Sequence, residues 1–395
     1  MPAEFLIFGA TLAGVALFHR QALPIAIAGL AFVIAFEWLV TSFPMGRGAA
    51  GLAAQFFHEW VLLSNLFMLL VGFAVLAAHF ELSGLPNALP RILPDDWTGA
   101  LALLAIVFVL SAFLDNIAAA LIGGATAHTL FRARVRIGYL AAIVAAANAG
   151  GAGSVIGDTT TTMMWVSGVA PVDVLHAYVA AIVAFLVVAI PAARAQQRFA
   201  PIVQDAPAAL AVDWARVATV AFVLASAVAV NVGINAMVPS RADRFPWIGA
   251  AVAFALAISC AWRRPDWNVV PDAVKGTVFL LCLVASASLM PVSSLPAASW
   301  QSSLALGFVS AFFDNIPLTA LALKQGGYDW GVLAYAVGFG GSMIWFGSSA
   351  GVALCNMFPE ARSTGRWLRE GWPVAVAYVA GFAALLATLG WNPRG

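Results

Sequence analysis

Residues 111–117 read Ser-Ala-Phe-Leu-Asp-Asn-Ile, and residues 310–316 read Ser-Ala-Phe-Phe-Asp-Asn-Ile, so one polar motif occurs twice in an apolar chain. A second motif follows each copy. Residues 150–159 read Gly-Gly-Ala-Gly-Ser-Val-Ile-Gly-Asp-Thr, and residues 340–349 read Gly-Gly-Ser-Met-Ile-Trp-Phe-Gly-Ser-Ser. Two motifs in the same order, with similar apolar runs around them, indicate an internal repeat.

The composition around these motifs is that of a membrane protein. Of the 395 residues, 63% are hydrophobic and 9% are charged, against about 45–50% and about 25% in soluble domains. The sequence therefore predicts an all-α polytopic membrane protein with lipid as its surroundings. The 19 basic and 18 acidic residues give no cationic field, so a nucleic-acid partner is not expected. No Lys follows the glycines at 150–153, so a phosphate loop and a nucleotide partner are not expected either.

Apolar runs long enough to span a bilayer predict ten crossings, while the two runs that carry the Asp-Asn motif favour re-entrant hairpins. The hairpin interpretation gives the stronger bias of Lys and Arg toward one side. It places both termini outside the cytoplasm of a cell with the chain in its inner (plasma) membrane. The predicted crossings are 4–18, 22–41, 60–80, 138–168, 172–193, 213–238, 246–262, 272–290, 331–357 and 372–391, and the hairpins are 98–131 and 300–326.

Each half then contains three spans, a re-entrant hairpin, a broken span and a final span. Five crossings per half is an odd number, so the two halves are expected to be inverted repeats, as in secondary transporters. The broken spans are predicted from glycine clusters, since each glycine inside a helix costs about 1 kcal/mol relative to alanine. Unwound backbone at membrane depth is tolerated against protein or a water-filled cavity. The alternative is that these glycines allow close helix packing. The clusters are Gly150, Gly151, Gly153 and Gly157 in the first half, and Gly338, Gly340, Gly341 and Gly347 in the second.

Three acidic residues fall at predicted membrane depth, where an ionised Asp costs about 2.5–3.5 kcal/mol or more. Asp115 and Asp314 lie at the two hairpin tips, and Asp158 lies at the first helix break. Carboxylate, amide and hydroxyl oxygens are the ligands that a hard cation prefers, so these three residues are the candidate Na⁺ ligands. One carboxylate can hold a proton or help to hold a cation, but not both. The alternative role for Asp115 and Asp314 is capping of the following helix.

The candidate ion and proton site extends to the polar neighbours of these acids. It comprises Asp115, Asn116, Asp158, Thr159, Thr160, Thr161, Asp314, Asn315, Ser348 and Ser349, with Asn148 and Ser342 as supporting hydrogen-bond donors. Glu37 lies near the end of its predicted span and is expected to reach toward the membrane interface.

Taken together, these motifs resemble the ion transporter superfamily, and within it the NhaD-type sodium/proton antiporters. The resemblance rests on residues 113–117 and 150–163 in the first half, and on 314–318, 340–342 and 347–351 in the second. It implies a scaffold domain and a transport domain that slides across the membrane in an elevator mechanism, usually in a homodimer. The implied division is scaffold helices in 1–97 and 196–299, and transport-domain halves in 98–195 and 300–395.

The expected function is a sodium (or lithium)/proton antiporter that exports Na⁺ in exchange for H⁺, with no cofactor. An alternative keeps the fold but makes the substrate an anion, as in the sodium-coupled di- and tricarboxylate carriers and arsenite permeases of the same superfamily. A third hypothesis is an intramembrane enzyme that uses the Asp residues for acid/base chemistry. The inverted repeat argues against it, because alternating access needs that symmetry and hydrolysis does not.

Overall fold

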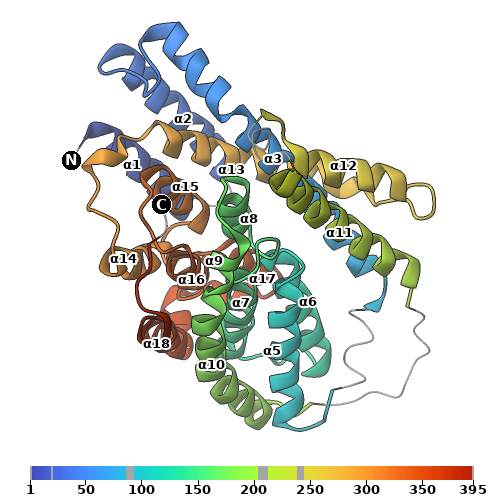
Figure 1. Cartoon of the computed structure of the whole chain (residues 1–395). Helices are drawn as coiled ribbons and strands as arrows, with labels where there is room; N and C mark the ends of the chain where they lie inside the picture. The colour runs from blue at the N-terminus through green and yellow to red at the C-terminus, as the bar shows by residue number, and fades with distance from the viewer. Residues whose placement is uncertain (1, 19–20, 86–92, 203–211, 238–243, 394–395) are drawn as a thin grey trace. The chain divides into compact units, whose positions relative to one another are not determined.

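The structure is a computed structural model that describes residues 2–18, 21–85, 93–202, 212–237 and 244–393, and over these ranges the chain is helical without a β-strand (Figure 1). Six of the described helices are long and apolar enough to cross a membrane. This confirms the prediction of an all-helical protein and supports several membrane crossings. The six are Ala22–Leu39, Gly48–Leu82, Pro171–Phe199, Trp214–Ile234, Trp267–Leu289 and Thr364–Leu389.

The chain folds into two compact units. Unit 1 contains Met1–Phe80, Trp214–Pro296 and Ile316–Gln325. Unit 2 contains Glu81–Asp213, Ala297–Asn315 and Gly326–Gly395. Residues 316–325, which the sequence assigned to the fourth segment, thus belong to unit 1, together with the helices before the first hairpin.

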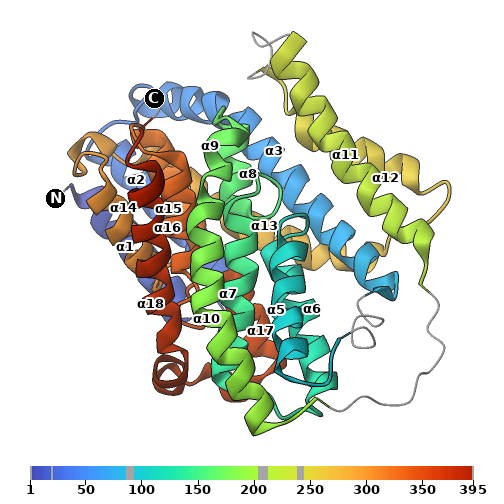
Figure 2. The ribbon, with the colours of Figure 1, turned by 60° about the horizontal axis from the view of Figure 1, so that its bottom comes forward.

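Unit 1 is built from α1 (Ala3–Leu17), α2 (Ala22–Leu39), α3 (Gly48–Leu82), α11 (Trp214–Met237), α12 (Trp247–Ser259) and α13 (Val270–Leu289). Helix α2 packs against α1 and α13, and α11 packs against α12, as Figure 2 shows for the last pair. Asn65 of α3 joins α12 by accepting a hydrogen bond from the Gly249 N–H at 3.0 Å.

Two predictions for unit 1 need correction. The predicted crossings 4–18 and 246–262 correspond to α1 and α12, which have 15 and 13 residues. At 1.5 Å per residue they are about 20 Å long, which is shorter than the ~30 Å hydrocarbon core. Glu37, which was expected to reach outward toward an interface, is instead buried in the protein with an exposure of 3%.

Unit 2 contains the two repeated sets of helices. The first set is α5 (Trp97–Ser111), α6 (Asn116–Leu130), α7 (Ile137–Ala152), α8 (Thr159–Val166), α9 (Pro171–Leu175) and α10 (Ala177–Phe199). The second is α14 (Trp300–Ser310), α15 (Asn315–Gln325, of which only Asn315 lies in unit 2), α16 (Trp330–Gly340), α17 (Ser349–Met357) and α18 (Thr364–Leu389). The predicted spans 138–168 and 331–357 are therefore each two helices with a break, and each Asp-Asn motif lies where one helix ends and the next begins.

The core of unit 2 is formed by α7 and α16, which pack against each other. All residues of α16 are buried, as are all residues of α7 except Gly138. A helix that is apolar on every face is expected in this position. Helices α5, α6, α10 and α18 surround α7, and α14 and α18 pack against α16.

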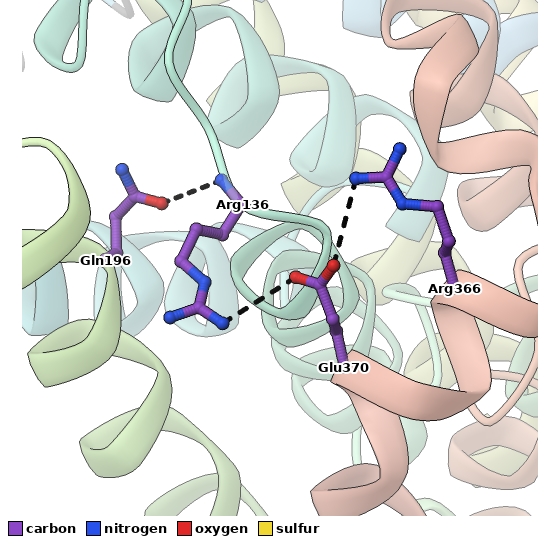
Figure 3. A network of polar contacts seen from close by, with 4 residues as sticks. All are labelled: Arg136, Gln196, Arg366 and Glu370. Carbon is purple, nitrogen blue, oxygen red and sulfur yellow. Dashed lines mark hydrogen bonds and ion pairs between the residues drawn. The ribbon is translucent and has the colours of Figure 1, made fainter.

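A polar network fixes the start of α7 to the two outer helices (Figure 3). Buried Gln196 of α10 accepts a hydrogen bond from the Arg136 N–H at 2.8 Å and donates one to the Arg134 carbonyl at 2.9 Å. Glu370 of α18 lies 3.8 Å from the guanidinium groups of both Arg136 and Arg366. The ion pairs are partly exposed and contribute little, so the Gln196 hydrogen bonds are the main polar link.

Candidate functional site

Polar residues occupy the helix starts next to the breaks of unit 2. Asp115, Asp158 and Ser348 are the N-cap residues of α6, α8 and α17, and Asp314 directly precedes α15. The first N–H groups of a helix have no partner within the helix and carry the positive end of its dipole. These positions therefore favour side chains that carry negative charge or accept hydrogen bonds.

Asp158 is the centre of the site, and its exposure is 3%. Its Oδ1 accepts a hydrogen bond from Asn116 Nδ2 at 3.2 Å. Its Oδ2 accepts from Asn315 Nδ2 at 3.4 Å and from the Thr160 hydroxyl. The structure thus brings together the Asn of both Asp-Asn motifs on one buried carboxylate. Hydrogen bonds to a charged group are about twice as strong as neutral ones, so these three donors hold the carboxylate in place.

Asn148 of α7 links the two halves a second time. Its Oδ1 accepts from Asn116 Nδ2 at 3.1 Å, and its Nδ2 donates to the hydroxyls of Ser342 at 2.9 Å and Ser348 at 3.1 Å. Asn148 and Ser342 are both fully buried. Asn148 therefore connects Asn116 of the first half with two serines of the second, which is a more central place than the sequence suggested.

The other two acids lie nearby but are bonded differently. Asp314 accepts a hydrogen bond from Ser349 Oγ at 2.9 Å. Asp115 interacts electrostatically with both Asp158 and Asp314. Its carboxylate faces the N–H groups of Asn116 and Ile117 without forming a cap hydrogen bond.

The three acids do not form a joint metal-binding cluster. Among the residues that the structure describes, no three His, Cys, Asp or Glu side chains gather closely enough to hold one metal ion. Hydrogen bonds join Asp158 to Asn116, Asn315 and Thr160, and they join Asp314 to Ser349.

The threonines after Asp158 have different partners. Thr161 donates to backbone carbonyls of the break, at Ser154 (2.5 Å) and Asp158 (2.9 Å), and Thr162 donates to Val155 at 2.9 Å. Thr160 alone of the three donates to the Asp158 side chain. The predicted ligand Thr161 thus supports the unwound backbone, while Thr159 lies half-buried at the first position of α8.

Sequence reasoning missed two residues that support the first break. Tyr178 of α10 donates its hydroxyl to the Gly150 carbonyl at 3.0 Å, and Ser154 donates to the Ala112 carbonyl at 2.5 Å. Both satisfy carbonyl groups near the break, as buried backbone requires. Tyr178 is remote from the motif in sequence, so no pattern pointed to it.

The repeated glycines permit matching close approaches in the two halves. A Cβ at Gly150 would clash with the Phe108 carbonyl of α5, and a Cβ at Gly340 would clash with the Gly307 carbonyl of α14. Next to the breaks, Cβ atoms at Gly151 and Gly341 would each lie 2.7 Å from a carbonyl oxygen, that of Gly157 and Gly347 respectively. Both sequence interpretations therefore hold, because the glycines allow close packing and the helices also break beside them.

Comparison with known proteins gives one informative relative. No protein-family model matches the chain. The chain is 28% identical to "Sodium/proton antiporter 1" of Arabidopsis thaliana over 328 residues, which is 71% of this chain and 54% of that protein. The chain thus spans about half the length of this curated relative. Similarity to an antiporter and six membrane-capable helices agree with the interpretation of the chain as a multi-pass membrane protein.

Proposed function

We propose that this chain is a secondary active transporter that exchanges Na⁺ (or Li⁺) for H⁺. The observation that carries the proposal is the buried Asp158 carboxylate, which receives hydrogen bonds from Asn116 and Asn315 of the two Asp-Asn motifs. A carboxylate at this depth is expected to have a partner ion, a proton or a cavity. The similarity to a named sodium/proton antiporter supports the same reaction.

The side chains around Asp158 suit a site that alternates between a proton and a cation. Each Asn amide has one acceptor oxygen and one donor nitrogen. In the arrangement seen, Asn116 and Asn315 present their nitrogens to Asp158. Rotation of these amides would present their oxygens to a cation bound by Asp158. When Asp158 carries a proton, its negative charge is lost and the cation is released, so the two cargoes compete for one oxygen pair.

The wider architecture belongs to the same proposal. The halves are inverted repeats with re-entrant hairpins at 98–131 and 300–326, unit 2 carries the cargo, and unit 1 supplies a scaffold in an NhaD-type elevator transporter. The protein acts as a homodimer in the inner membrane with both termini outside the cytoplasm. Support comes from the repeated motifs and from the matching glycine contacts of the two halves.

The proposal is tested with purified protein in liposomes that contain a pH-sensitive dye and carry an imposed pH gradient. Addition of Na⁺ or Li⁺ is expected to dissipate the gradient, and K⁺ is the comparison ion. Asp158→Asn is expected to abolish the response, with the exposed Glu360→Gln as the matched control. Unchanged exchange by Asp158→Asn would remove this carboxylate from the mechanism.

The same liposomes test the anion alternative through uptake of a radiolabelled dicarboxylate or of arsenite. Among the described residues, no Arg or Lys is a hydrogen-bond partner of Asp158 or Asn148. An anion at the centre would therefore lack a cationic partner there. Sodium-dependent uptake of the dicarboxylate, with no effect of Na⁺ on the pH gradient, would favour the alternative over the antiporter.

A further inference from the structure

A second group of polar and charged side chains, buried or half-buried, lies in unit 1. It consists of Glu37 on α2, Gln55 and Glu59 on α3, and Lys324 near the end of α15, and we call it the Lys324 cluster. Glu37 and Gln55 are 3% and 4% exposed, and Glu59 and Lys324 are half-buried. None of these residues is a hydrogen-bond partner in the Asp158 network, and the exchange proposed above does not invoke them.

Lys324 is fixed at the end of α13. Its Nζ donates to the carbonyl of Ser288 and to that of Met290 at 2.6 Å. The last carbonyls of a helix carry the negative end of its dipole, which favours a cation there. Gln55 Nε2 lies 3.5 Å from the same Ser288 carbonyl and 3.4 Å from Glu59 Oε1. Two backbone carbonyls therefore hold the ammonium group. Among the described residues, it forms no ion pair with the carboxylate of Glu37 or of Glu59.

Two oxygen atoms of the cluster are buried without a donor. They are Oε2 of Glu37 and Oε1 of Gln55. Buried polar atoms in folded proteins are nearly always hydrogen-bonded, and an exception calls for an explanation. The cluster and the two backbone carbonyls that Lys324 contacts contain more acceptor oxygens than N–H groups. This shortage of donors explains the two unpaired oxygens. One additional hydrogen on Glu37 would supply a missing donor.

The charges of the cluster show the same imbalance. Both Glu37 and Glu59 interact electrostatically with Lys324. Two carboxylates thus face one ammonium group. Glu4 of α1 adds a further negative charge near Glu37, and exposed His58 lies near Glu59. With Glu37, Glu59 and Lys324 all ionised, the cluster carries an excess negative charge around the buried Glu37, which is costly. Uptake of one proton neutralises it.

We propose that Glu37 is a second proton-binding site of this chain, with Glu59 and Lys324 setting the charge that it experiences. A proton fits better than a metal cation, because the fixed ammonium group of Lys324 would repel a metal ion. Proton binding at Glu37 does not depend on the proposed exchange at Asp158, so each can fail without the other.

The test is infrared difference spectroscopy of the purified full chain, recorded as the pH is lowered. A protonated carboxyl group has a C=O stretching band that an ionised one lacks. Glu37→Gln is expected to remove one pH-dependent carboxyl band from the wild-type spectrum, whereas Glu360→Gln, which changes an exposed glutamate, leaves that band in place. A Glu37→Gln spectrum with the wild-type carboxyl bands would overturn the proposal.

A second pair of variants tests the role of the ammonium group. In Lys324→Met the carboxylates lose their positive neighbour, so the midpoint of proton uptake is expected to move to higher pH. Lys324→Arg keeps the charge and is expected to keep the midpoint. An unchanged midpoint in Lys324→Met would contradict the assigned role of Lys324. Asp158→Asn, measured in the same way, is expected to retain the Glu37 band.

Discussion

The two sets of motifs in unit 2 lie at corresponding helix ends and breaks but carry different side chains there. In the first half the buried helix carries Asn148 and the break ends at Asp158, whereas the matching positions of the second half are Gly338 and Ser348. Asn148 donates to Ser348, and the space beside Gly338 is occupied by Asp158, whose Oδ2 lies 3.5 Å from the place of a Cβ. The larger residue of one half thus faces the smaller residue of the other. Of the two matching helix breaks, the first alone therefore carries a carboxylate at this position.

The largest expected effect comes from making the halves alike at the break. Asp158→Ser gives the first half the residue of the second, and removes the acceptor of three hydrogen bonds. Hydrogen bonds to a charged group contribute about 1.5–3 kcal/mol each, so loss of two of the three corresponds to a fall of at least about 100-fold in Na⁺-dependent exchange, at about 1.4 kcal/mol per factor of ten. Ser348→Ala keeps the carboxylate and is expected to cost about tenfold or less. Equal losses in the two variants would mean that Asp158 has no special role.

The shared frame is tested by alanine at the matching glycines. Gly150→Ala and Gly340→Ala each force a Cβ against a carbonyl oxygen of a neighbouring helix. Overpacking of this kind costs about 1–3 kcal/mol, so both variants are expected to lower the apparent Tm in detergent by similar amounts. Gly276→Ala is the control, because a Cβ there meets nothing within 4 Å. A stable Gly340→Ala beside an unstable Gly150→Ala would break the correspondence between the halves.

The link between the halves is measured by a double-mutant cycle. Asn148→Ala removes the hydrogen bond to Ser348, and Ser348→Ala removes it from the other side. The two losses of stability are expected to add up to more than the loss in the double variant, by about 0.5–1.5 kcal/mol. Thermal unfolding in detergent gives the four values. Strict additivity would show that this contact contributes nothing.

The smallest expected effect concerns the serines that begin the repeated motif. Both are fully buried. Ser310 Oγ donates to the Val337 carbonyl at 2.7 Å, whereas Ser111 Oγ has no hydrogen-bond partner among the residues that the structure describes. Ser310→Ala is therefore expected to cost about 1 kcal/mol of stability. Ser111→Ala is expected to be neutral or slightly stabilising, since it removes an unsatisfied hydroxyl. The reverse order of apparent Tm values would show that the two serines are not in the environments described.

The sequence predicted the elements of unit 2 well because their signals are local. Glycine clusters marked both helix breaks, and the Asp-Asn pairs marked the other two helix ends. It failed where the outcome depends on a distant neighbour. Glu37 was expected near an interface, but it is buried, and Lys324, which is remote in the chain, interacts with it electrostatically. No local sequence pattern predicts that Tyr178 donates to the Gly150 carbonyl or that Asp158 lies beside Gly338. The sequence also does not show that Thr161 donates to backbone carbonyls of the break.

The most direct test of the central claim is the number of protons released when Na⁺ is added to the purified protein in weakly buffered solution. If Na⁺ and H⁺ compete for Asp158, the wild-type chain releases protons on addition of Na⁺ and Asp158→Asn does not. Proton release by Asp158→Asn equal to that of the wild type would contradict the account.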